Sequence, residues 1–183
     1  ADLKPNDTVV YTYLGNTYPD MPVFSAAGTY PIGIKVTNPN YVTFEQTATL
    51  TIAKASLTNV TMTGFDGVYD GKKHQITFGN LPTDVVPVYS VNGGAWSKTA
   101  PAYTTPTDGA MNVTVKLESV NYVTRTEDIV LNVRPATIEG VTATATNLTA
   151  DGSLKNLVTV SGTKSGDTVR YAVGGGEFSA SVP

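Results

Sequence analysis

The chain has 183 residues, of which 40% are hydrophobic and only 15% are charged, and its formal net charge is -3. It holds no basic run for a phosphate backbone and no apolar run near the roughly 20 residues of a membrane helix, so we expect neither nucleic-acid binding nor membrane insertion. Cysteine is absent, which excludes disulfides, thiolate metal sites and thiol nucleophiles. Abundant Thr, Val and Gly favour strands and turns over helices.

Three segments of residues 1–55 are predicted to be strands. The first covers residues 9–13 and ends at the turn residues Leu14–Thr17, since Gly and Asn tolerate positive φ. The other two show alternation of apolar with polar residues, which is typical of half-buried strands. Their apolar positions are Ile32, Ile34 and Val36, then Ala48, Leu50 and Ile52.

The same plan recurs further along the chain. Asn40-Tyr41 reappears as Asn121-Tyr122, an offset of 121 − 40 = 81, and Leu50 reappears as Leu131 at the same offset. Alternation in the second copy predicts a buried face, made of Val113, Val115, Leu117, Ile129, Leu131 and Val133. The residues between them, Thr114, Lys116 and Asn132, are predicted to face water or a neighbour.

A third copy begins after residue 136. Asp70-Gly71 recurs as Asp151-Gly152, and 89–97 recurs as 171–179 with an offset of 171 − 89 = 82, which implies one inserted residue. We therefore predict the C-terminal part of a repeat in 1–55, a complete repeat in 56–136 and the N-terminal part of a further repeat in 137–183. Because the chain opens inside a repeat, we expect a fragment of a longer protein.

The repeats predict an all-β fold of tandem antiparallel immunoglobulin-like sandwiches, each of about 81 residues, a length sufficient for a small sandwich. The joints around Ala55 and Pro135 leave little slack, so the array is expected to be elongated and fairly stiff. Adjacent repeats of the same chain are the first expected partners.

Hairpin turns carry the candidate binding residues. Asn92-Gly93 predicts a tight hairpin turn, and four aromatic residues lie near this turn and its counterparts: Tyr13, Tyr18, Trp96 and Phe178. Exposed rings beside a turn can stack on a glycan or anchor a host protein. The alternative is that Trp96 caps the end of the sandwich core.

Catalytic and metal sites find little support. His74, the sole histidine, lies in the polar segment 71–75 and is predicted to be a solvated loop residue. Asp70 precedes a glycine and most simply forms a turn, with a calcium site shared with Asp66 as the alternative. We predict no catalytic residue, no cofactor and no metal, and therefore no enzyme.

A cross-link between lysine and asparagine is a further alternative. Lys35 and Lys116 recur together with Asn40 and Asn121, and surface-protein domains can join such pairs through an isopeptide bond. Alternation argues against it, because Ile34 and Val36 point to one side and Lys35 to the other, toward solvent.

Taken in order, these segments resemble a known family. Tyr69-Asp70-Gly71, residues 89–96, Gly109, residues 113–116 and Asn121-Tyr122 are similar to the MBG-type and YDG-type immunoglobulin-like repeats of large bacterial surface proteins. Residues 28–41 carry the pattern most plainly, and the third copy departs from it with Ala150 and Gly174. The resemblance implies a secreted or cell-surface, non-catalytic role in adhesins or cell-wall proteins.

Three functions follow as hypotheses. The first is an extracellular stalk or spacer, the second is a module that binds glycan or host protein through the aromatic hairpin ends, and the third is an accessory of a secreted glycan-active enzyme. The two outer partial repeats would expose apolar faces and strand edges. They are expected to complement each other within a chain or head-to-tail between chains, unless the true boundaries are shifted.

Overall fold

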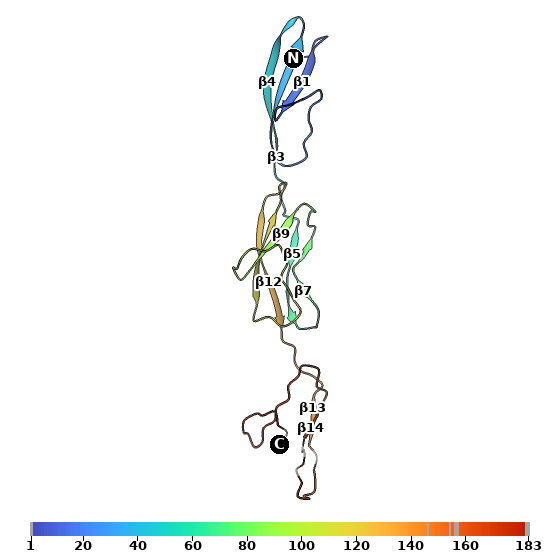
Figure 1. Cartoon of the computed structure of the whole chain (residues 1–183), viewed down its shortest axis with the longest axis vertical. Helices are drawn as coiled ribbons and strands as arrows, with labels where there is room; N and C mark the ends of the chain where they lie inside the picture. Colours follow the sequence, from blue (N-terminus) through green and yellow to red (C-terminus); the bar gives the residue numbers. More distant parts are fainter. Residues whose placement is uncertain (1, 146, 154, 156–157, 182–183) are drawn as a thin grey trace. The chain divides into compact units, whose positions relative to one another are not determined.

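The computed structural model describes residues 2–145, 147–153, 155 and 158–181, and every regular element in that part of the chain is a β-strand (Figure 1). The predicted all-β class is confirmed, with several antiparallel sheets. The chain divides into two compact units, Ala1–Pro135 and Ala136–Pro183. The predicted segment 137–183 includes residues 146, 154, 156–157 and 182–183, which lie outside the described residues.

The first unit opens with a sheet of four strands in the order β2-β1-β3-β4. They are β1 (Thr8–Tyr13), β2 (Asn16–Tyr18), β3 (Gly28–Asn38) and β4 (Tyr41–Ile52). All neighbours pair antiparallel, with Tyr11 opposite Ile34 and Ile34 opposite Gln46. Since side chains alternate across a strand, Ile32, Ile34 and Leu50 share one face, whereas Lys35 and Glu45 share the other.

Eight further strands follow in the same unit. They are β5 (Thr61–Thr63), β6 (Phe65–Val68), β7 (His74–Gln75), β8 (Thr77–Gly79), β9 (Val86–Val91), β10 (Ala102–Tyr103), β11 (Met111–Glu118) and β12 (Arg125–Arg134). The main sheet has the order β6-β12-β11-β9, and two short sheets pair β5 with β8 and β7 with β10. Only the β6–β12 pair is parallel among the described ladders.

A sandwich-like core lies between these sheets. Its most completely buried side chains are Val113, Val115, Leu117, Leu131 and Val133, as the alternation predicted. Leu57, Val60 and Ile76, from the segment that carries the short sheets, pack into the same cluster. Thr114, Lys116 and Asn132 are half-buried on the opposite side of their strands, in agreement with the predicted register.

The second unit contains one two-stranded sheet among its described residues. Strands β13 (Thr142–Ala145) and β14 (Val158–Ser161) pair antiparallel, with Ala143 opposite Val160. An isolated bridge between Tyr171 and Ser179 closes a hairpin further along the chain. The residues of β13 are all exposed.

Candidate functional site

The four aromatic candidates lie at three hairpins. Positive φ values occur at Leu14-Gly15 (48° and 78°), Asn92-Gly93 (48° and 73°) and Gly174-Gly175 (60° and 79°), which confirms the predicted turns. In the second hairpin Gly94 N–H donates to the Val91 carbonyl over 2.9 Å, and the third repeats this bond at equivalent positions. All three hairpins therefore turn through two consecutive residues of positive φ.

Tyr13 is part of an aromatic cluster in the first unit. Its ring centroid lies 4.9 Å from that of Phe24 in an edge arrangement and 6.0 Å from that of Tyr30. Phe24 stacks on Tyr30 at 3.9 Å, and the Tyr30 hydroxyl donates to the Ala26 carbonyl over 2.7 Å. This cluster packs the segment between β2 and β3 against the sheet, so Tyr13 has a structural role.

Tyr18 differs from Trp96 and Phe178 in its pairing. Tyr18 lies opposite Tyr11, because the first hairpin turn has only two residues. In the other two hairpins the residue after the aromatic, Ser97 or Ser179, forms the bridge instead. Only Trp96 and Phe178 are therefore at equivalent sites, and both side chains are exposed.

Trp96 lies on the outer side of the main sheet. Its neighbour Ser97 bridges Tyr89, which belongs to the core cluster, so alternation turns Trp96 away from the core. Lys116 Nζ lies 4.8 Å from the indole centroid, and the same ammonium pairs with Glu118 at 2.7 Å. Trp96 is 50% exposed. It packs against a lysine instead of capping the core, and one part of its ring surface remains open.

His74 is not the solvated loop residue that the sequence suggested. It begins β7, and its side chain is only 15% exposed. The imidazole stacks on Phe65 with centroids 3.4 Å apart, and Nε2 donates to Asp70 Oδ1 over 2.8 Å. The Phe65 ring covers one face of the imidazole, and the Asp70 carboxylate binds its edge. The polar residues next to His74 in the sequence gave no sign of these contacts.

Asp70 forms the turn that its sequence position predicts. Its Oδ1 accepts a bond from Lys72 N–H over 2.9 Å, and Gly71 takes a φ of 76°. The pKa of Asp70 is lowered, first by the Lys72 backbone bond and then by the bond from His74. Asp151 repeats the arrangement with Lys155 in place of the histidine.

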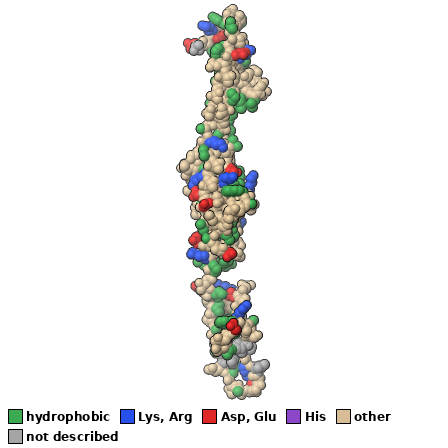
Figure 2. All heavy atoms as spheres, turned by 90° about the vertical axis from the view of Figure 1, so that its left-hand side faces the viewer, with side chains coloured by type: hydrophobic (Ala, Val, Ile, Leu, Met, Phe, Trp, Pro, Cys, Tyr) green, Lys and Arg blue, Asp and Glu red, His purple; other side chains and the backbone are tan. Residues whose placement is uncertain are grey.

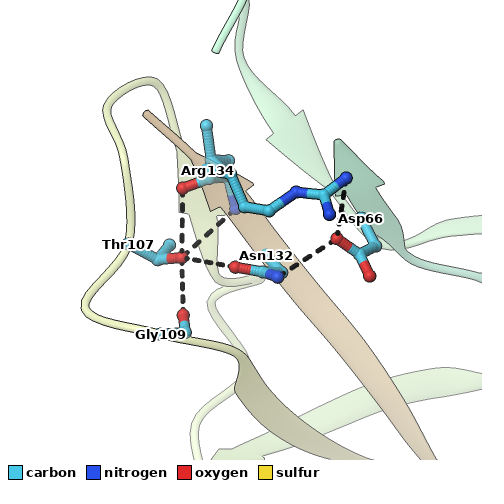
Figure 3. Close-up of polar contacts among 6 residues, drawn as sticks. Asp66, Thr107, Gly109, Asn132 and Arg134 are labelled. Atoms are coloured by element: carbon cyan, nitrogen blue, oxygen red, sulfur yellow. Dashed lines mark hydrogen bonds and ion pairs between the residues drawn. The ribbon is translucent and has the colours of Figure 1, made fainter. Parts of the chain in front are cut away.

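Asp66, the other acid of the predicted calcium alternative, is held in a polar network (Figure 3). Its Oδ1 accepts a bond from Asn132 Nδ2 over 3.1 Å and lies 3.7 Å from the Arg134 guanidinium. On the far side of Asn132, the Thr107 hydroxyl donates to the Gly109 carbonyl over 2.7 Å. The network joins β6, β12 and the segment before β11.

Other carboxylates are also engaged by strand neighbours. Asp128 accepts a bond from Thr114, Glu127 pairs with Arg125, and Glu45 pairs with Lys35. Within the part of the chain that the structure describes, no group of three or more His, Asp or Glu side chains is placed to hold a metal ion.

The two lysines considered for an isopeptide bond form ion pairs with glutamates instead. Lys35 Nζ lies 2.8 Å from Glu45 Oε1 with its side chain 47% exposed, so it faces solvent as alternation predicted. Lys116 pairs with Glu118 and lies over Trp96. The surroundings of both lysines are those of surface ion pairs and not of a buried cross-link.

Asn121 is the residue whose role the sequence did not indicate beyond its recurrence. Its Oδ1 accepts a bond from Ala27 N–H over 2.9 Å, and its Nδ2 donates to Asp84 Oδ2 over 3.0 Å. Its carbonyl accepts from Ala55 N–H, and the Ala55 carbonyl accepts from Val123 N–H, each over 2.9 Å. The pKa of Asp84 is lowered, chiefly by the Asn121 bond.

Asn121 therefore links Ala27, which lies between β2 and β3, to Asp84, which lies just before β9. The link between β4 and β5 is further held by Lys54, whose Nζ donates to the Ser119 carbonyl over 3.2 Å. We name this group, made of Ala27, Lys54, Ala55, Asp84 and Asn121, the joint.

Comparison of the sequence with protein-family models and with curated proteins finds no match. The resemblance to MBG-type and YDG-type repeats accordingly stays a prediction. On the face that Figure 2 shows, acidic and basic side chains are interspersed. Among the described residues, no helix is long and apolar enough to cross a membrane.

Proposed function

We propose that this chain is a non-catalytic stretch of tandem immunoglobulin-like repeats that serves as an extracellular stalk or spacer in a bacterial surface protein. The observation that carries the proposal is the joint, where Asn121 bonds to both segments that meet there. A spacer holds another module at a distance, so its links have to resist bending. Side-chain and backbone bonds at a short link meet that need.

Matching register supports the repeat interpretation. Ile32 lies opposite Ala48 in the first sheet, and Val113 lies opposite Ile129 in the main sheet, so both strands carry the same offset, 113 − 32 = 129 − 48 = 81. The β13–β14 pair matches the β5–β8 pair with one inserted residue: Ala143 stands 143 − 62 = 81 residues after Met62, and its partner Val160 stands 160 − 78 = 82 residues after Phe78, the partner of Met62. A one-residue slip would move every side chain to the other face, so the agreement between the β3–β4 and β11–β12 pairs is a strict one.

The joint is expected to recur at the start of each repeat. Asn40 stands 81 residues before Asn121 (121 − 40 = 81). The link to a preceding repeat would therefore have the same side-chain amide as the joint. An elongated array follows, in which each repeat contacts its neighbours through one asparagine-centred link. Secretion and surface attachment are parts of the proposal that rest on the family resemblance.

A distance measurement tests the joint directly. The chain has no cysteine, so Thr47→Cys and Val130→Cys provide the only two sites for spin labels. We expect a narrow label-to-label distance distribution by pulsed electron resonance, and a clearly broader one after Asn121→Ala. The matched control is Asn112→Ala, an exposed asparagine of β11 outside the joint. A broad distribution in the unsubstituted chain would refute the stiff spacer.

The proposal includes catalytic silence. His74 is engaged with Phe65 and Asp70, so no unengaged imidazole is offered to a substrate at that position. We expect no hydrolysis of peptide or glycan substrates by the purified chain. Activity that persists through purification and disappears in His74→Ala would overturn this part.

Binding at Trp96 is the second candidate function. A half-exposed indole beside Lys116 suits a sugar ring or an anchoring contact with a host protein. A glycan array with the whole chain tests it, with Trp96→Ala as the variant and Phe178→Ala as the control from the equivalent hairpin position. Signals that vanish only in Trp96→Ala would favour a binding module over a plain spacer.

A further inference from the structure

A charged groove extends from the neighbourhood of Trp96 to the joint. Lys116, which lies over the indole, pairs with Glu118, and Glu118 lines the groove. Its lining also includes Val86, Lys98, Lys54 and Asp84. The volume of the groove is about 590 Å³, within the roughly 300–1,000 Å³ of small-molecule sites. All these residues belong to the first unit, so the groove does not depend on where the second unit lies.

Trp96 and Lys98 lie on the same side of their segment. The residue between them, Ser97, bridges Tyr89, whose side chain belongs to the core cluster. Alternation therefore turns Trp96 and Lys98 to the outer side of the main sheet. Lys116 reaches the same side, because its Nζ lies 4.8 Å from the indole centroid. An aromatic surface and two ammonium groups are thus combined on one face.

Both acids of the groove are engaged by residues of the protein. Glu118 Oε1 lies 2.7 Å from Lys116 Nζ. Asp84 Oδ2 accepts bonds from the Ser119 hydroxyl and from Asn121 Nδ2, each over 3.0 Å. The two carboxylates therefore serve the ion pair beside Trp96 and the joint.

Two lysines of the groove have no such partner. Among the ion pairs of the described residues, none includes Lys54 or Lys98. Both residues are exposed, and the Lys54 ammonium donates to the uncharged Ser119 carbonyl over 3.2 Å. With Lys116, the surface has three ammonium groups against two carboxylates. A ligand that carries negative charge is complementary to this surface.

We infer that this groove binds an acidic carbohydrate chain, with one sugar ring stacked on Trp96 and an anionic group of the chain at Lys98. The half-exposed indole offers the apolar surface on which a sugar ring stacks. Lys54 contacts Ser119, three residues or about 10 Å of extended chain beyond Lys116, so the groove suits an oligosaccharide better than a single sugar. The inference rests on the second candidate function, binding at Trp96, and adds the charge of the ligand.

The Phe178 hairpin has the exposed ring without the lysine. Phe178 stands where Trp96 stands (178 − 96 = 82), and Ala180 stands where Lys98 stands (180 − 98 = 82). Phe178 is exposed, as Trp96 is. Phe178→Ala therefore removes an equivalent aromatic surface that has no cation two residues further along.

A glycan array of matched pairs tests the charge of the ligand. Each pair presents an oligosaccharide that contains uronate, sialic acid or sulfate beside its uncharged parent. We expect the whole chain to bind acidic members of at least one class, and to bind their parents about tenfold more weakly. Equal binding of acidic members and parents overturns the inference but leaves the second candidate function standing, and binding to neither overturns both. The label distances that test the spacer are independent of either result.

Calorimetry with the acidic oligosaccharide that binds best assigns the site. Trp96→Ala should raise Kd about tenfold, and Lys98→Gln should raise it about threefold to fivefold. Lys98→Gln should also weaken the dependence of Kd on salt, because salt screens the attraction between exposed charges. Trp96→Ala should leave that dependence unchanged. Both side chains are exposed, so neither change is expected to unfold the main sheet.

Lys73→Gln and Phe178→Ala are the matched controls. Lys73 is exposed and lies outside the groove, so its loss changes the net charge as Lys98→Gln does without touching the site. Both controls should bind like the unsubstituted chain. The formal net charge of -3 gives the whole chain no general attraction for anions. Acidic binding that keeps its strength and salt dependence in Lys98→Gln, or that weakens as much in Lys73→Gln, contradicts the inferred site.

Discussion

Truncation of Leu131 to alanine tests the register of the main sheet most directly. Leu131 is among the least exposed side chains of the described residues and lies opposite Met111 on β11 and Phe65 on β6. The change removes three carbon atoms, which at about 0.8 kcal/mol per buried methylene costs about 2.4 kcal/mol. The cavity adds to this, because paired strands on both sides of β12 limit its collapse. We expect a total loss of about 3–4 kcal/mol.

Two further truncations serve as internal standards. Val130 is the residue before Leu131 on β12 but faces outward and is 45% exposed, so Val130→Ala should cost less than about 1 kcal/mol. Leu50 occupies the place equivalent to Leu131 in the first sheet without a covering layer. Because Leu50 is partly exposed, Leu50→Ala should also cost less than about 1 kcal/mol.

Denaturant titration followed by tryptophan fluorescence measures these losses. Trp96 is the sole tryptophan and lies over Lys116 beside the main sheet, so its signal reports the unfolding of the middle strands. The midpoint should fall for Leu131→Ala while the slope stays unchanged. A loss below about 1 kcal/mol, or a larger loss for Val130→Ala than for Leu131→Ala, would show that the buried face is wrongly assigned.

Three more predictions concern backbone and charge. Leu14 has a φ of 48° and is exposed, so Leu14→Asn should raise the free energy of unfolding of the first sheet by about 0.5–1 kcal/mol, as calorimetry would show. Gly64→Ala should reduce the melting temperature sharply, because the added Cβ would lie 2.0 Å from the Val130 carbonyl oxygen; an unchanged melting temperature would contradict the packing. Hydrogen bonds from Lys155 and then from Ser153 lower the pKa of Asp151 to about 2, so its carboxyl resonance should titrate with that midpoint. The stabilisation present above the ordinary pKa of 3.8 should be lost as pH falls through about 2.

Alternation was sufficient to predict the core strands but not their partners. The period of two at Val113, Val115 and Leu117 identifies the buried face, because any other register would bury Thr114 and Lys116. No pattern in the sequence predicts the parallel pairing of β6 with β12, because this pairing depends on contacts between residues 66 positions apart, such as Asp66 and Asn132. Local sequence therefore shows which face of a strand is buried more clearly than it shows which strand pairs with it.

The same limit explains the two surprises at the candidate sites. His74 lies in a polar stretch, and only the fold brings Phe65 beneath its ring. Asn121 recurs in the sequence, but its partner Ala27 is 94 positions away and contributes a backbone N–H, which any residue except proline could supply. Sequence can reveal that such a residue repeats, whereas its bonding becomes visible only in the folded chain.

Leu50 and Leu131 show that burial in this molecule is decided by the covering layer. Both leucines sit in the same register of equivalent strands, yet only Leu131 is buried. Part of the first sheet has a local substitute, because Phe24 stacks on Tyr30 and Ile32 is buried nearby. That cover keeps one portion of the face from water and leaves the portion beside the β4 edge open.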